Sequence, residues 1–140
     1  MVDPASVGAT GEPFVLEVER GKLREFARAT FTVPPGDWSL PTFLTTAFHW
    51  QSGAADPWEA VRMDPARGLH AEQEFVFHGP PPRAGDTLIG VSTIESVTDK
   101  QGRRGGTMTF AVMRTEFRDP SGRLVAETRL TGVETAQAPT

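Results

Sequence analysis

The second half of the chain consists of four runs in which apolar and polar side chains alternate. Alternation with a period of two is typical of β-strands that bury one face. The runs are Leu69–His78, Thr87–Thr98, Thr107–Arg118 and Leu124–Thr135. Turn-forming residues separate them, and the last turn, Asp119–Gly122, has Pro at its second position and Gly at its fourth. Because such short links join antiparallel neighbours, the pattern predicts a four-stranded meander.

The first half of the chain has a mixed pattern. Alternating apolar residues over Phe14–Val18 predict a short strand. In Lys22–Thr30 the apolar positions recur at i, i+3, i+4 and i+7, which predicts an amphipathic helix lying on a sheet. The segment Phe31–Pro41 has too many prolines and glycines for a regular element.

Two features of the next segment concern helical structure. Thr42–Trp50 is rich in threonine and aromatic residues and fits either a strand or a buried helix, because the run is too short for its period to decide. Asp56 precedes Pro57, so we expect Asp56 to cap a helical turn that begins at Pro57. The order of strand, helix, irregular segment and meander predicts one α+β domain over residues 13–135. Residues 1–12 and 136–140 are expected to be flexible ends.

Composition narrows the classes of function. The chain has 140 residues, enough for one core, and a formal net charge of −4, which argues against binding to a nucleic-acid backbone. It has no Cys, which excludes disulfides, thiolate metal sites and a Cys nucleophile. The sequence shows no signal-peptide pattern and no apolar run near the ~20 residues of a membrane helix, so we expect a cytoplasmic protein. No serine lies in a Gly-x-Ser-x-Gly elbow, and Gly105–Gly106 is not followed by the residues of a phosphate loop.

Four segments carry a resemblance to a known family. They are Val18–Thr30, the Pro41-Thr42-Phe43 step, His70–Asp86 and Met108–Thr131. Together they resemble the non-catalytic, N-terminal-type hot-dog domain of MaoC-like hydratases and dehydratases. The sequence departs from the family pattern at Ala71, Phe77 and Gly79, where Gly, Tyr and Arg are frequent.

The resemblance implies a single hot-dog fold, an antiparallel sheet packed on a central helix that is short or degenerate here. Such domains pair with a catalytic hot-dog, fused or separate, and the pair hydrates or dehydrates thioesters of coenzyme A or acyl carrier protein with R stereochemistry. It also implies that this chain is the acyl-binding, non-catalytic member of the pair. Whether the chain forms a homodimer when alone stays open from the sequence. No cofactor is implied.

The family's catalytic half uses an Asp and a His close together, with an Asn between them. The nearest spacing here is Asp64 to His70, which is one residue too long and lacks the Asn. Glu72 is two residues after His70, on the same side of a regular strand, so these two are the weak catalytic candidates. His78 is also on the side of His70 if the strand is regular, so both can line a substrate cleft, and His70 is a candidate for substrate binding. A structural role fits His70 equally well, and it fits His78, beside the proline turn, better. His49, His70 and His78 have no spaced carboxylate partner, so no metal site is predicted.

Aromatic and basic residues are the candidates for substrate binding. The aromatic candidates for the wall of an acyl pocket are Phe43, Phe48, Trp50 and Trp58. For any one of them alone, plain core packing is the better interpretation, and only as a group do they indicate an acyl pocket. Arg83, and Arg103 and Arg104 beside Lys100 at a hairpin tip, suit the phosphates of coenzyme A or an acidic carrier protein. A solvated hairpin tip explains the second group as well.

Two other functions stay open from the sequence. The first is a self-sufficient hot-dog acyl-CoA thioesterase with Asp56, Glu59 or Glu72 as base. The second is a binding module for acyl groups or other ligands, without activity of its own.

Overall fold

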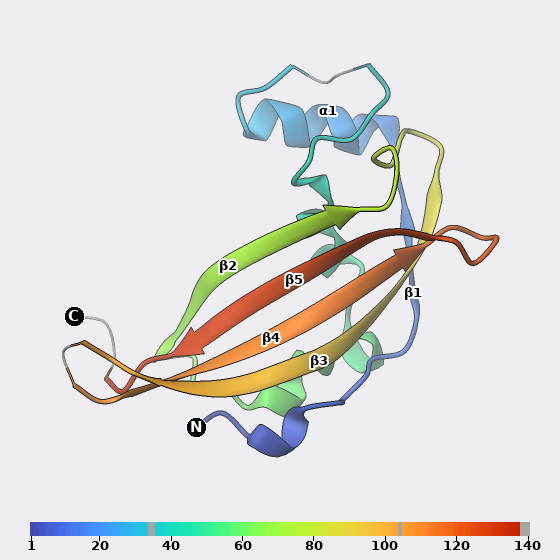
Figure 1. Cartoon of the computed structure of the whole chain (residues 1–140). Helices are drawn as coiled ribbons and strands as arrows, with labels where there is room; N and C mark the ends of the chain where they lie inside the picture. The colour runs from blue at the N-terminus through green and yellow to red at the C-terminus, as the bar shows by residue number, and fades with distance from the viewer. Residues whose placement is uncertain (34–35, 104, 138–140) are drawn as a thin grey trace.

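The computed structural model describes residues 1–33, 36–103 and 105–137. Five strands form one antiparallel sheet in the order β1-β3-β4-β5-β2. The strands are β1 (Phe14–Glu17), β2 (Gly68–Phe77), β3 (Thr87–Gln101), β4 (Thr107–Arg118) and β5 (Leu124–Glu134). The four predicted strands are therefore present, and β3 continues three residues further than the alternation indicated. The predicted four-stranded meander is wrong in one pairing, because β2 pairs with β5 and not with β3. Only β3, β4 and β5 form a meander, since the proline-rich link after β2 is a crossover and not a tight hairpin turn. Strands β1 and β2 occupy the two edges (Figure 1).

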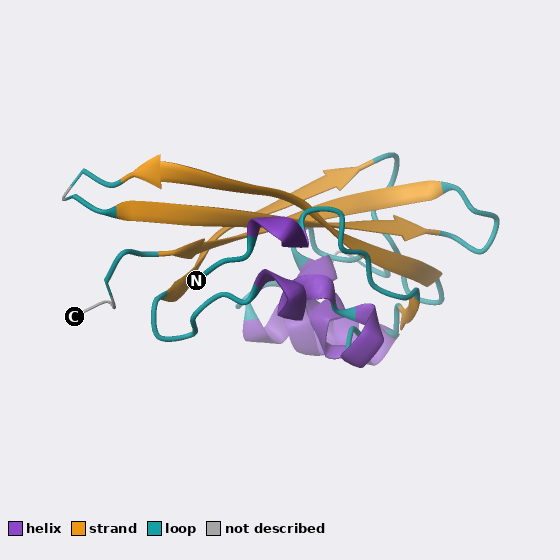
Figure 2. Ribbon diagram, turned by 90° about the horizontal axis from the view of Figure 1, so that it is seen from below, coloured by secondary structure: helices purple, strands orange, loops and turns teal. Residues whose placement is uncertain are grey.

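All helical segments lie on one face of the sheet, and the opposite face is left uncovered (Figure 2). The one α-helix is α1 (Arg20–Ala29), and four short 3₁₀ turns accompany it among the described residues. These turns are η1 (Pro4–Ser6), η2 (Phe43–His49), η3 (Gly53–Ala55) and η4 (Pro57–Val61). We call the covered face of the sheet the inner face and the other the outer face.

The central helix that the resemblance implies is replaced here by η2, η3 and η4. The Thr46 hydroxyl donates to the Phe43 carbonyl, which gives the backbone of η2 a local alternative to helical bonding. Gly53 has a φ of +55° and Pro57 carries no amide hydrogen, so neither continues a helix. The Asp56 side chain accepts from the Trp58 amide at 2.9 Å, which confirms the predicted cap. The undecided segment Thr42–Trp50 is thus helical but broken.

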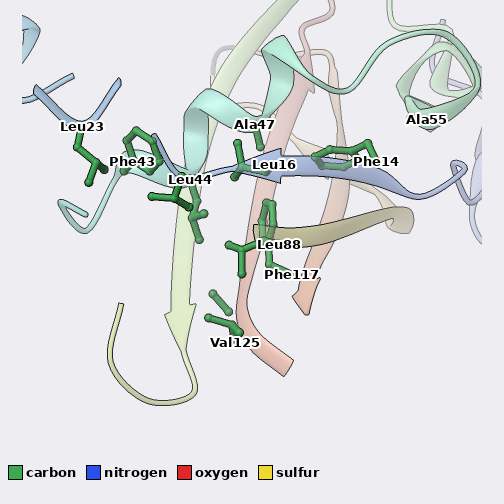
Figure 3. Close-up of a cluster of buried hydrophobic side chains, with 12 residues drawn as sticks. Phe14, Leu16, Leu23, Phe43, Leu44, Ala47, Ala55, Leu88, Phe117 and Val125 are labelled. Carbon is green, nitrogen blue, oxygen red and sulfur yellow. The ribbon is translucent and has the colours of Figure 1, made fainter. Parts of the chain in front are cut away.

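The core lies between the inner face and these helical segments (Figure 3). Phe117 of β4 is fully buried and meets Phe14 of β1 edge to face, with ring centroids 6.2 Å apart. Helix α1 buries Leu23 and Ala27, the face that its period predicted, and its Phe26 packs edge to face on Phe43. Aromatic pairs of this geometry contribute about 0.5–1.5 kcal/mol beyond the area they bury.

The first twelve residues differ from the expectation of a flexible arm. They run along β3, where the amides of Gly8 and Gly11 donate to Ile94 and Ser92 carbonyls at 2.9 Å. Val2 is 4% exposed and belongs to a second apolar cluster with Val61 and Ile94. The segment is held because it satisfies part of the β3 edge that the four-residue strand β1 leaves unpaired.

Candidate functional site

A groove of about 280 Å³ lies between η2 and the inner face of β2, β5 and β4, and we call it the inner groove. Six apolar side chains line it: Leu44, Ala47, Phe48, Met113, Phe117 and Leu130. Six polar side chains also line it: Thr45, Gln51, His70, Gln73, Thr115 and Thr128. The groove exists because η2 is shorter than a full central helix and leaves part of the inner face uncovered. A cavity of this kind can hold an elongated, partly polar ligand.

The groove opens beside β2, an edge strand. Within the described part of the chain, β2 pairs with β5 on one side only, so its other row of backbone N–H and C=O groups has no strand partner. Leu69 of this strand is 46% exposed. A ten-residue edge with an exposed leucine is a site at which a second sheet can add. A ligand in the groove would therefore lie next to whatever docks on β2.

A bulge in β2 separates the two weak catalytic candidates. His70 pairs with Gly132 and Glu72 with Thr131, so Ala71 is an extra residue in the strand. Because adjacent residues of β5 point to opposite faces, His70 lies on the inner face and Glu72 on the outer face. The expectation that they share a side is therefore not met. His70 lines the inner groove and is its one titratable side chain among the described residues.

The same bulge places His78 on the outer face, away from His70. Its Nε2 lies 2.7 Å from Glu127 Oε2. This hydrogen bond is the main cause that holds the pKa of Glu127 below its usual value, and the guanidinium groups of Arg129 and Arg114 add to it. His78 thus belongs to the network of ion pairs on the uncovered face of the sheet.

Asp64, whose spacing to His70 is nearest to that of the family's catalytic Asp and His, does not line the groove either. Its Oδ2 accepts from Arg67 Nε at 3.0 Å, and this bond lowers the pKa of Asp64 from its ordinary value. Arg67 also bonds Glu134 at 2.8 Å, which ties the start of β2 to the end of β5. Among the described residues, no group of three or more His, Asp or Glu side chains is placed to hold a metal ion.

The four aromatic candidates do not form one wall. Phe48 lines the inner groove and is 63% exposed. Phe43 and Trp50 line a different cavity of about 420 Å³ between α1, β1 and η2. Trp58 packs on the second apolar cluster and over Gly132, where a Cβ would lie 2.7 Å from its ring.

The link from β2 to β3, which carries Arg83, and the β3–β4 hairpin, which carries Arg103, lie at opposite ends of the sheet (Figure 1). Arg83, in the link from β2 to β3, has its guanidinium 5.1 Å from the centre of the Trp38 ring, in a cleft of about 460 Å³ that Arg123 also lines. Arg103 is exposed in the β3–β4 hairpin, and Arg104 is outside the described residues. Because β3 has 15 residues, these ends are roughly 45 Å apart along the strand, and a single phosphate group cannot contact both.

Sequence reasoning missed the polar half of the groove. Gln51 Nε2 donates to Ser92 Oγ at 2.7 Å, and Ser92 shares a second bond of 2.7 Å with Thr115. Thr115 and Thr128 are register partners on the inner face. The sequence did carry a signal for Thr115 and Thr128, because both occupy positions of their strands that the alternation of apolar and polar residues assigns to the buried face, where an apolar side chain is expected.

No helix among the described residues is long and apolar enough to cross a bilayer.

Comparisons with known proteins agree with this architecture. Residues 5–128 match the family model described as FAS1-like, dehydratase domain region. A "UPF0336 protein" of Streptomyces griseus is 30% identical over 139 residues, covering 89% of each chain. A second "UPF0336 protein", from Streptomyces avermitilis, is 32% identical over 116 residues, covering 72% of this chain and 77% of the relative.

Solved structures of the same fold include two-component assemblies. The HadBC (3R-hydroxyacyl-ACP dehydratase) complex of Mycobacterium tuberculosis is similar with a TM-score of 0.65 and 26% identity, over 91% of this chain and 98% of that one. The ChsH1–ChsH2 complex of the same organism has a TM-score of 0.71 at 14% identity, over 98% and 89% of the two chains. A MaoC-like dehydratase from Phytophthora capsici has a TM-score of 0.65 at 21% identity, over 98% of this chain and 49% of that one. With its five-stranded sheet and matched dehydratase region, the chain belongs to the family of FAS1-like dehydratase domains and has the hot-dog fold of the MaoC-like dehydratases.

Proposed function

We propose that this chain is the non-catalytic, acyl-binding subunit of an R-specific enoyl-thioester hydratase or (3R)-hydroxyacyl-thioester dehydratase. A catalytic hot-dog partner supplies the acid–base groups. In this proposal the acyl chain of a coenzyme A or carrier-protein thioester occupies the inner groove, and the pair works in the cytoplasm, in fatty acid or lipid metabolism.

The observation that carries the proposal is the composition of the groove. Dehydration needs one group to take the α-proton and another to protonate the departing hydroxyl. The groove offers the imidazole of His70 and no carboxylate among its described lining residues. Glu72 lies on the other face of the sheet and Asp64 is paired with Arg67. The groove can therefore hold an acyl chain but lacks the second group that the chemistry requires.

The same placement disfavours a self-sufficient thioesterase. Asp56 caps η4 through the Trp58 amide, and Glu59 is exposed in the same turn. Neither these residues nor Glu72 lines the inner groove. A general base must lie within hydrogen-bond reach of the water or proton on which it acts.

The unpaired edge of β2 supports a partner that adds its own sheet there. The groove opens beside this edge, so groups on a docked hot-dog would face a thioester at the groove mouth. The structural relatives named as complexes, HadBC and ChsH1–ChsH2, support a second hot-dog chain as the partner. Arg83, beside Trp38 in its cleft, is the candidate for the phosphates of the thioester carrier. Arg103, at the far hairpin, is then free for the acidic surface of a carrier protein.

The test is co-expression with a candidate catalytic hot-dog protein, followed by hydration assays on crotonyl-CoA and longer enoyl-CoA substrates. The pair should be active and each chain alone inactive or nearly so. Hydration by the isolated chain would overturn the subunit assignment, and hydrolysis of acyl-CoA by it would support the thioesterase instead.

A substitution in the groove tests the acyl-binding role separately. Gln73→Trp places a large side chain in the groove next to the β2 edge. The variant pair should retain activity on crotonyl-CoA and lose it on long enoyl chains. Val76→Trp is the matched control because Val76 lies on the outer face of the same strand. Equal loss in both variants would contradict the assignment of the groove.

A further inference from the structure

One row of inner-face positions is polar where its neighbours are apolar. Ser92, Thr115 and Thr128 are register partners across β3, β4 and β5, and their exposed fractions are 0%, 4% and 7%. The inner-face rows on either side contain Ile94 with Met113, and Phe117 with Ala126. A row of hydroxyls thus crosses the sheet beneath η2 and ends in the inner groove.

The protein satisfies the first two hydroxyls but not the third. Ser92 and Thr115 bond each other at 2.7 Å, and Gln51 donates to Ser92. Within the described part of the chain, the Thr128 hydroxyl forms no hydrogen bond, although the residue is more than nine-tenths buried and lines the groove. The side-chain amide of Gln73, one strand nearer the edge, is also without a bond there. Both groups face the groove and stay accessible to water, since Ser39 Oγ is the one fully buried side-chain atom without a hydrogen bond among the described residues. A ligand that fills the groove removes this water, which costs free energy that a bond to the ligand must offset.

The unsatisfied groups point to the chemistry of the ligand. We infer that the inner groove selects acyl chains that carry an oxygen function, a hydroxyl or a ketone, in the interior of the chain. The Thr128 hydroxyl can both donate and accept a hydrogen bond, and the Gln73 amide donates through its nitrogen and accepts through its oxygen. Either a hydroxyl or a ketone of the ligand therefore finds a partner. A saturated chain would fill the apolar half of the groove and leave both groups without a bond.

The position of this oxygen follows from the sheet. The inference rests on the proposed function, in which the thioester lies at the β2 edge. Neighbouring strands are about 4.8 Å apart, so Thr128 is about one strand spacing inward from β2. The recognised oxygen is therefore distinct from the one that the reaction removes, which must reach the catalytic groups of the partner. Thr128 is a specificity-determining residue in this reading, with no part in the chemistry.

The experiment compares two probes and two variants of the full chain. The probes are S-decanoyl-pantetheine and S-(5-oxodecanoyl)-pantetheine, and dissociation constants are measured by calorimetry. The variant Thr128→Val keeps the shape and strand propensity of the side chain and removes its hydroxyl. Thr131→Val is the control, because Thr131 is on the same strand and faces the outer side.

The unvaried chain and Thr131→Val should bind the oxo probe about three- to tenfold more tightly than the saturated probe, the range of one neutral hydrogen bond. Thr128→Val should remove this preference and leave the affinity for the saturated probe unchanged or higher. Equal affinity for both probes in the unvaried chain, or a preference that survives Thr128→Val, would overturn the inference and leave the acyl-binding role standing. Binding of neither probe would overturn the proposed function and the inference together.

Discussion

Replacing Gln51 by Met should destabilise the protein although neither side chain is large or charged. Gln51 connects the helical layer to the sheet, because its Nε2 donates to the Ala55 carbonyl at 3.1 Å and to Ser92 Oγ at 2.7 Å. Methionine fills similar space but cannot donate. The change therefore removes two hydrogen bonds while it keeps most of the packing.

The expected loss follows from these two bonds. A net contribution of about 0.5–1.5 kcal/mol each gives a loss of about 2 kcal/mol in the free energy of unfolding. Ser92 keeps its bond to Thr115, whereas no other bond to the Ala55 carbonyl is found among the described residues. With a urea dependence typical of small domains, the midpoint of unfolding should fall by roughly 1 M.

The assay is urea unfolding followed by circular dichroism, with Gln101→Met as the matched control. Gln101 is exposed at the end of β3 and donates to Thr107 across the hairpin, so its replacement should change stability by less than about 0.5 kcal/mol. Amide hydrogen exchange should also quicken in η2 and η3 of the Gln51 variant. Equal midpoints for the two variants would refute the view that Gln51 holds the helical layer on the sheet.

Three further predictions concern stability. Gly90→Ala should destabilise the core by about 1–3 kcal/mol, measured by urea unfolding, because its Cβ would lie 2.3 Å from Phe14 Cζ. Phe31→Gly should stabilise the chain by about 0.5–1 kcal/mol in the same assay, because Phe31 is 100% exposed and ends α1 with a φ of +55°, where glycine is favoured. Glu127→Gln should flatten the acid limb of the pH–stability curve. The pKa of Glu127 is lowered in the folded state, chiefly by His78, so its contribution is present above its ordinary value of 4.5 and lost as the pH falls through the folded pKa.

For each of the three stability predictions, a control variant or a contradicting result can be named. Gly21→Ala in α1 meets no atom within 4 Å and should be neutral or stabilising, so a loss in both glycine variants would contradict the clash with Phe14. Destabilisation by Phe31→Gly would mean that the exposed ring contributes more than its backbone strain costs. For the pH curve, Glu74→Gln is the comparison, since Glu74 bonds the same Arg129 but is more exposed. If the pH–stability curve of Glu127→Gln runs parallel to that of the unvaried chain, the lowered pKa of Glu127 does not contribute to stability.

The sequence predicted the secondary structure better than it predicted the candidate site. Alternation and helical period come from the burial of one face of each element, and β2 to β5 and α1 follow them closely. The Asp56–Pro57 start of η4 depended on neighbouring residues alone and was confirmed. The side on which His70 lies depended instead on a bulge at Ala71, and no local pattern in the run marks that extra residue.

The sequence by itself determined which segments become strands, where they turn, and that one apolar face needs cover, because these depend on the chemistry of neighbouring residues. Only the tertiary structure decided which polar groups share a cavity. Thr128 and Gln73 line one groove because β5 pairs with β2, which lies far from it in the sequence, and Arg83 and Arg103 are separated by the length of β3. Strand order and register set these distances, and they result from packing the whole sheet on η2, which no single segment specifies.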